Sequence, residues 1–267
     1  MDRLPLVRRG AGEAVEVNSP VTPAAGSSAA SVRAAETPSD RLGSPVLPYT
    51  AVLFDCDGVL VDSESITQSV LRDMLEELGW SLTREECIRL FVGKALKDEW
   101  EVILRHTGVR IDDAWLAAFR ERRNAALRTD LTSVPGIESA LEAVRAAYGD
   151  RIAVGTGADR GKCELQLGLT GLDRYFSGRV FSGMEMPRSK PAPDVYLAAA
   201  RALGIDPAGA AVIEDSAAGV RAGAAAGARV LGFSRGDVAS TPAAELLAAG
   251  ASEVFADMRE LPALLGA

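Results

Sequence analysis

Short apolar runs that alternate with helical patterns constrain the fold of this chain more than any other feature of its sequence. After residue 48, each run is too short for a helix and suits a strand that is buried on both faces. A repeated order of strand, helix and strand implies a parallel sheet with helices on both of its faces. The expected fold class is therefore α/β, with a doubly wound parallel sheet. The predicted strands are 51–54, 151–155, 180–182, 210–213, 229–232 and 253–255, and the predicted helices that alternate with them are 136–148, 159–168, 192–203, 216–226, 240–248 and 258–265.

One interval breaks this alternation, because residues 64–132 contain helical patterns and no predicted strand. Thr83 and Glu86 form a capping box that marks one helix start. An all-helical segment inserted after the first strand predicts a separate small domain. The expected organisation is a tail over 1–48, a core made of 49–63 and 133–267, and a helical domain over 64–132. Within that domain, helices are expected over 64–78, 83–91, 94–106 and 113–128.

The first 48 residues differ in composition from the rest of the chain. Ala, Ser, Pro, Gly and Thr make up 26 of them, and Phe, Trp, Tyr and Ile are absent. Such a segment cannot bury enough apolar surface to offset the entropy that is lost on ordering. We therefore expect a disordered tail. No apolar segment follows Arg8 and Arg9, so the tail does not resemble a secretory signal.

Charge and cysteine content exclude several classes of function. The net charge is -8, whereas a protein that binds nucleic acid through its phosphates usually carries a basic excess. No stretch approaches the ~18 apolar residues that a transmembrane helix needs. The three cysteines lie far apart without a CxxC pair, which fits a reducing cytosol better than disulfides or a zinc site. We expect a cytoplasmic monomer or weak dimer that binds neither nucleic acid nor membrane.

Carboxylates follow two of the predicted strands, at the edge where open parallel sheets bind ligands. Asp55 and Asp57 follow the first strand, and Glu214 and Asp215 follow the fourth. Acidic groups beside a buried strand are costly unless a cation balances them. Oxygen ligands of this kind select a hard metal such as Mg2+. Taken alone, the first pair also fits an ordinary turn rich in Asp and Gly.

Two further loops are expected at the same edge. Gly155, Thr156 and Gly157 combine a hydroxyl with a flexible backbone and can donate hydrogen bonds to an anion. Lys190 stands before Pro191 in a stiff loop, although alone it would fit an ordinary surface lysine. Together, the groups at this edge could hold Mg2+ and a phosphoryl group, and they could offer a nucleophile.

These loops belong to four longer segments, FDCDGVLVDSE (54–64), GTGAD (155–159), SKPAPDVY (189–196) and VIEDSAAGV (212–220). In these segments and their order, the chain resembles the haloacid dehalogenase-like superfamily of phosphotransferases. It is most similar to the branch of phosphoglycolate phosphatases and beta-phosphoglucomutases, in which a helical cap is inserted after the first segment. The resemblance implies a Rossmann-like core with an all-helical cap domain over 64–132.

The resemblance also implies roles for the acidic residues. Asp55 would be the nucleophile that forms an aspartyl-phosphate. Asp57 would protonate the leaving oxygen and then activate water as a base. Mg2+ would be held by the Asp55 carboxylate, the Asp57 backbone carbonyl and Asp215, with Glu214 near the ion.

Phosphate binding would fall, by the same resemblance, to small and basic residues. Thr156 and the backbones of Gly58 and Gly157 would bind phosphoryl oxygens, and Lys190 would neutralise negative charge. Because this chain has Gly157 where relatives often have Ser or Asn, binding there would depend on backbone, Thr156 and Arg160.

The cap is expected to select the substrate. The loop around Gly93 resembles the family's specificity loop, and Lys94 is its candidate for contacting substrate. Arg123 and Asn124, on the last cap helix, are further candidates, although all three could belong to a solvated helix face. Beta-phosphoglucomutases carry an arginine where this chain has Leu96, which favours a phosphatase.

The predicted function is a Mg2+-dependent phosphatase that hydrolyses a small phosphorylated metabolite through an aspartyl-phosphate. The substrate would be a sugar phosphate or a phosphoglycolate-like acid. A phosphomutase of the beta-phosphoglucomutase type is the alternative, since it would use the same two aspartates. A catalytically inactive binding domain is a third reading, against which the intact acids and Lys190 argue.

Overall fold

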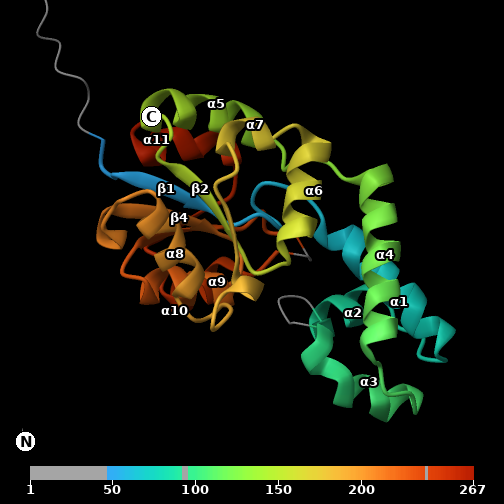
Figure 1. Cartoon of the computed structure of the whole chain (residues 1–267). Coiled ribbons are helices and arrows are strands. Elements are labelled where there is room, and N and C mark those ends of the chain that lie inside the picture. The colour runs from blue at the N-terminus through green and yellow to red at the C-terminus, as the bar shows by residue number, and fades with distance from the viewer. Residues whose placement is uncertain (1–46, 92–95, 238–239) are drawn as a thin grey trace, which may run out of the picture. The chain divides into compact units, whose positions relative to one another are not determined.

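A six-stranded parallel sheet forms the centre of the structure, which is a computed structural model that describes residues 47–91, 96–237 and 240–267. These residues lie in one compact unit of the chain, Ser44–Ala267. The strand order is β3-β2-β1-β4-β5-β6, and every pairing is parallel, which confirms the predicted α/β class (Figure 1). The strands are β1 Ala51–Phe54, β2 Ile152–Thr156, β3 Val180–Ser182, β4 Ala210–Glu214, β5 Arg229–Phe233 and β6 Glu253–Phe255.

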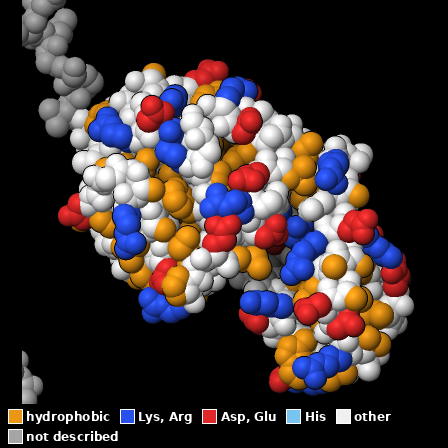
Figure 2. All heavy atoms as spheres, in the orientation of Figure 1, with side chains coloured by type: hydrophobic (Ala, Val, Ile, Leu, Met, Phe, Trp, Pro, Cys, Tyr) orange, Lys and Arg blue, Asp and Glu red, His pale blue; other side chains and the backbone are white. Residues whose placement is uncertain are grey.

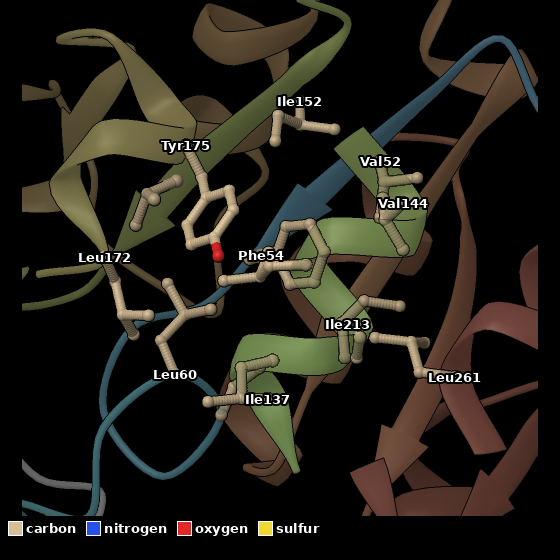
Figure 3. Packing of buried hydrophobic residues seen from close by; sticks show 14 of the residues in the cluster. Val52, Phe54, Leu60, Ile137, Val144, Ile152, Leu172, Tyr175, Ile213 and Leu261 are labelled. Atoms are coloured by element: carbon tan, nitrogen blue, oxygen red, sulfur yellow. The ribbon is translucent and has the colours of Figure 1, made fainter. Parts of the chain in front are cut away.

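Both faces of the sheet are covered by helices. Side chains alternate along β1, so that Val52 and Phe54 enter one hydrophobic cluster and Leu53 enters the other (Figure 3). Residues buried on both faces explain why the strands read as continuous apolar runs. The first cluster lies under α5 Ile137–Tyr148, α6 Arg160–Thr170, α7 Asp173–Phe176 and α11 Leu261–Leu265, and the second under α8 Asp194–Ala202, α9 Ala217–Ala225 and α10 Ala243–Ala249.

The observed helices differ from the predicted ones mainly in short segments. Helix α7 was not predicted, since its four residues are too few to carry a periodic pattern. The predicted helix 258–265 is a 3-10 turn, Met258–Glu260, followed by α11. The predicted tail over 1–48 lies, apart from Leu47 and Pro48, outside the described residues.

Four helices between β1 and α5 share a hydrophobic cluster of their own, and we call them the cap helices. The capping box is confirmed, because Glu86 Oε2 accepts from the Thr83 backbone N–H at 2.9 Å and Thr83 Oγ1 accepts from the Glu86 backbone at 3.1 Å. The predicted helix 94–106 begins, within the described residues, as a 3-10 helix over Leu96–Glu99. The cap helices are α1 Glu64–Glu77, α2 Arg84–Phe91, α3 Trp100–Thr107 and α4 Asp113–Asp130.

The two segments that join the cap helices to the sheet lie side by side. The Asp62 backbone N–H donates to the Thr132 carbonyl at 2.9 Å, and the Val134 N–H donates to the Leu60 carbonyl at 3.0 Å. The cap helices are thereby attached at the carboxyl end of β1, where the first acidic loop lies. Among the described residues, no helix is long and apolar enough to cross a membrane.

Candidate active site

A cavity of about 630 Å³ lies at the carboxyl ends of the strands and is lined by both the cap helices and the loops that follow the strands. Acidic and basic side chains gather where α6 faces the cap helices (Figure 2). The structure brings most of the predicted site residues together here: Asp55, Asp57, Gly58, Gly157, Lys190, Asp215 and Arg123 all line the cavity.

Lys190 joins the two acidic segments. Its ammonium group lies 2.8 Å from Asp55 Oδ1 and 2.6 Å from Glu214 Oε1. Burial and the charge of Glu214 raise the pKa of Asp55 to about 7, although Lys190 opposes this rise. Burial alone would lower the pKa of Lys190, but the two carboxylates hold it well above its ordinary value. Lys190 is therefore a fixed cation at the end of β1.

Glu214 is fully buried behind this cation. Its Oε1 also accepts from the Tyr196 hydroxyl at 2.7 Å, and its Oε2 accepts from the Ser216 hydroxyl at 3.1 Å. Burial and the charge of Glu214 raise the pKa of Tyr196 well above its ordinary value, so Tyr196 remains a hydrogen-bond donor. Glu214 does not line the cavity, and its main contact in this structure is with Lys190.

Three carboxylates form a cluster that suits a cation. One oxygen each from Asp55, Glu214 and Asp215 lie within 4.8 Å of one another. Asp215 has no hydrogen bond or ion pair among the described residues, and burial beside Asp55 and Glu214 raises its pKa well above its ordinary value. Three oxygen donors with one uncompensated carboxylate are the donor set that Mg2+ prefers. The residues present therefore fit a hard divalent cation.

Gly58 allows Asp215 to approach the first acidic loop. Its φ of +80° is a conformation that favours glycine, and a Cβ at this position would lie 1.9 Å from Asp215 Oδ2. Only a residue without a side chain can therefore occupy this turn.

Asp57 is held by a set of donors that sequence reasoning did not find. Its Oδ1 accepts from Lys162 Nζ at 2.7 Å, from Gln166 Nε2 at 2.8 Å and from the Ser63 hydroxyl. Burial would raise the pKa of Asp57, but the charge of Lys162 and these hydrogen bonds outweigh it and lower the pKa to about 2. The spacing of Lys162 and Gln166, four residues apart on the helix after β2, places both on one face and was the available signal.

The GTGAD segment (155–159) contributes less to the cavity than predicted. Gly157 lines it, but the buried Thr156 does not, and Thr156 Oγ1 accepts from the Ala158 backbone N–H at 3.0 Å. Arg160 binds Glu185 through two nitrogens, at 2.7 and 2.6 Å, and does not line the cavity. The expectation that Arg160 binds phosphate is therefore not supported by its position.

The structure describes two of the four cap residues that are candidates for contacting substrate. Gly93 and Lys94 lie outside the described residues, and their roles stay predictions. Arg123 is buried and lines the cavity, whereas Asn124 does not line it and accepts hydrogen bonds from the Arg123 guanidinium. On α1, Thr67 also lines the cavity, and its buried hydroxyl has no hydrogen-bond partner among the described residues.

Comparisons with known proteins agree with this geometry. The family model of haloacid dehalogenase-like hydrolases matches residues 49–227. The chain is 32% identical to the plasmid phosphoglycolate phosphatase of Cupriavidus necator, over 82% of this chain and 94% of that protein. It is 29% identical to the 6-phosphogluconate phosphatase of Escherichia coli strain K12, over 68% of this chain and 81% of that protein.

A solved structure gives the same assignment. The chain is similar to a HAD family hydrolase of Deinococcus radiodurans R1 that was crystallised with bound phosphate and sodium, with a TM-score of 0.69 and 36% identity. The match covers 82% of this chain and 96% of that one. An inactive binding domain does not agree with these matches. The chain therefore belongs to the haloacid dehalogenase-like hydrolases, and within that family it is a phosphoric monoester hydrolase.

Proposed function

We propose that this hydrolase is a Mg2+-dependent phosphatase that releases phosphate from a small phosphorylated metabolite through an aspartyl-phosphate on Asp55. The observation that carries the proposal is the position of the Lys190 ammonium, 2.8 Å from Asp55 Oδ1 and 2.6 Å from Glu214 Oε1, beside the Asp215 carboxylate. A fixed cation beside a carboxylate and a cation-binding cluster is what a negatively charged phosphoryl group requires.

Asp55 supplies the nucleophilic oxygen. Its Oδ1 is bound to Lys190, while no described residue donates to its Oδ2, which is free to attack phosphorus. The bond to the leaving oxygen breaks as the Asp55–phosphorus bond forms. The Asp55 carboxylate, the Asp57 backbone carbonyl and Asp215 would hold Mg2+, with Glu214 near the ion, and the bound cation would offset the charge of the phosphoryl oxygens. Lys190 neutralises the remaining charge on the same side.

Asp57 transfers protons in both half-reactions. It gives a proton to the leaving oxygen and then takes one from the water that attacks the aspartyl-phosphate. Lys162 and the hydrogen bonds to Asp57 favour its ionised form in the free enzyme, so a protonated substrate would be one source of the first proton. Phosphate monoesters lose their second proton at about pH 6, so the monoanion can bring it.

We further propose that the cap helices are a separate substrate-selecting domain over 64–132, set on a core of 49–63 and 133–267. Their own hydrophobic cluster and the paired connecting segments support this division. Leu96 lines the cavity without supplying a charge, which supports a phosphatase over a phosphomutase. The named relatives act on phosphorylated acids and, in the fructose-1-phosphate phosphatase YqaB, on a neutral sugar phosphate.

Phosphate release from a panel of phosphorylated metabolites, with Mg2+ and with EDTA, tests the proposal. We expect release that needs Mg2+ and that Asp55→Asn abolishes, while the matched exposed variant Asp113→Asn keeps it. The panel includes beta-glucose 1-phosphate, scored separately for glucose 6-phosphate. Normal activity of Asp55→Asn, or turnover in EDTA, would contradict the proposal. Isomer formation without phosphate release would assign a phosphomutase instead.

A further inference from the structure

Two buried cations that line the cavity come from different parts of the fold. Arg123 extends from α4 of the cap helices, and Lys162 extends from α6 on the core. Their side chains are only 9% and 8% exposed. The two charges are close enough that Arg123 opposes protonation of Lys162, although the charge of Asp57 keeps the pKa of Lys162 raised.

The two cations differ in how well they are compensated. Lys162 is paired with Asp57 at 2.7 Å. The Nε and Nη2 atoms of Arg123 donate to the neutral side-chain oxygen of Asn124, at 3.1 and 2.9 Å. Its Nη2 also donates to Oδ2 of Asp159, at the long distance of 3.5 Å, and the Asp159 side chain is 38% exposed. The only carboxylate paired with Arg123 among the described residues is therefore distant and partly screened by solvent, and no described residue accepts from its Nη1.

A buried guanidinium with only a distant, partly exposed counter-ion is costly, because burial removes its hydration and the screened charge of Asp159 replaces little of it. The bonds to Asn124 hold the planar group in one orientation but add no negative charge. An anionic group of a ligand, placed in the cavity beside Arg123, would supply the missing charge. It would also lie close to Lys162 and would weaken the repulsion between the two cations.

We propose that Arg123, held by Asn124 and assisted by Lys162, is a subsite for a carboxylate of the substrate, so that the enzyme prefers phosphorylated carboxylic acids to neutral sugar phosphates. This inference rests on the proposed phosphatase function and names its substrate class. A single negative charge matches the pair of buried cations, since Arg123 is only weakly compensated and the charge of Lys162 is already balanced by Asp57. A planar carboxylate also fits the remaining edge of a guanidinium.

Matched substrate pairs test the subsite, because each pair differs only in a carboxylate or a CH2OH group. The pairs are phosphoglycolate with 2-hydroxyethyl phosphate, 3-phosphoglycerate with glycerol phosphate, and 6-phosphogluconate with glucitol 6-phosphate. The measured quantity is the ratio of kcat/KM values for the acid and neutral members. Both values come from one enzyme sample, so any unfolded fraction cancels. The three chain lengths also measure how far the subsite lies from the phosphoryl group.

We expect the wild-type protein to prefer the acid of at least one pair by about tenfold or more, the effect of one charge-assisted hydrogen bond. Arg123→Met should reduce that ratio to about one, and Arg123→Lys should restore part of it. The control is Arg128→Gln on the same helix, which is exposed, does not line the cavity and should leave the ratio unchanged.

Other outcomes would overturn the inference. If the wild-type protein preferred no acid, or if Arg123→Met kept the preference, Arg123 would not be a carboxylate subsite. Phosphate release from the neutral members would still support the phosphatase function in that case. A tenfold preference for glucitol 1,6-bisphosphate over 6-phosphogluconate would contradict the choice of a carboxylate. Absence of Mg2+-dependent phosphate release from every compound and from an aryl phosphate would remove the proposed function and this inference together.

Discussion

The ammonium group of Lys162 lies 2.7 Å from Oδ1 of Asp57, a residue 105 positions earlier in the chain. Gln166 and Ser63 donate to the same oxygen, so the carboxylate is fixed in one rotation. No described residue donates to Oδ2, which leaves this oxygen for proton transfer. Lys162 therefore acts in the proposed reaction as a positioning residue for the acid and base.

Lys162→Met should lower kcat/KM by an amount that depends on the leaving group of the substrate. A poor alkoxide leaving group needs a well-placed acid, whereas p-nitrophenolate leaves without one. We expect kcat/KM to fall about a hundredfold for an alkyl phosphate and less than about tenfold for p-nitrophenyl phosphate. Lys162→Arg should recover part of the loss. A parallel fall for both substrates would show that Lys162 does not act through Asp57.

Gly58 and Gly79 form a matched pair for testing the cation site. Both have positive φ, but a Cβ at Gly58 would lie 1.9 Å from Asp215 Oδ2, whereas nothing lies within 4 Å at Gly79. Gly79→Ala should cost only the backbone strain, ~1–2 kcal/mol of unfolding free energy, and keep activity. Gly58→Ala should in addition lose Mg2+ affinity, measured by titration calorimetry. Equal Mg2+ affinity in both variants would argue against Asp215 as a ligand.

Mg2+ should stabilise the folded protein more at neutral pH than in acid. The pKa of Asp55 is about 7 in the folded protein against an ordinary 3.8, so without metal the folded state binds more protons over this range. Its stability should then fall as pH rises from about 4 to about 7. Mg2+ needs the deprotonated carboxylates, so its stabilising effect should grow over the same range.

Thermal unfolding with Mg2+ and with EDTA, at about pH 5 and about pH 8, measures this effect. Asp215→Asn should remove most of the Mg2+-induced rise in Tm, and the exposed Asp113→Asn should keep it. An equal rise at both pH values, or a full rise in Asp215→Asn, would be inconsistent with the carboxylate cluster as the cation site.

Gly219 has too little space for a side chain. A Cβ there would lie 1.7 Å from Glu214 Oε1, so Gly219→Ala should displace Glu214 from Lys190 and Tyr196. Disrupting a buried charge pair costs ~3–5 kcal/mol, and we expect a loss of that order with a large fall in kcat. Gly168→Ala, at an exposed position of α6 with nothing within 4 Å, should stabilise by ~1 kcal/mol. Urea unfolding of both variants distinguishes these outcomes.

The sheet and the convergence of its loops could be predicted because each strand leaves a local pattern in the sequence and parallel strands end at one edge of the sheet. Buried strands such as β1 read as apolar runs, and the carboxyl ends of parallel strands meet at one edge. Asp55, Lys190 and Asp215 therefore meet as predicted. The short helix α7 was missed because four residues cannot show a 3.6-residue period.

Contacts between distant side chains could not be predicted in the same way. Lys162 was not among the predicted site residues, because its contact with Asp57 depends on how α6 packs on the sheet. Tyr196 was not among them either, because only the fold brings its hydroxyl to Glu214. The burial of Arg123 depends likewise on where α4 lies over the cavity.

Trapping the phosphorylated intermediate shows whether Asp55 is the residue that becomes phosphorylated. Turnover is stopped with acid, the acyl phosphate is reduced with borohydride, and peptides are analysed by mass spectrometry. We predict conversion of Asp55 to homoserine in the wild-type protein with substrate and Mg2+, and none with EDTA or without substrate. Steady phosphate release with unmodified Asp55, or with the modification on another residue, would show that Asp55 is not the nucleophile.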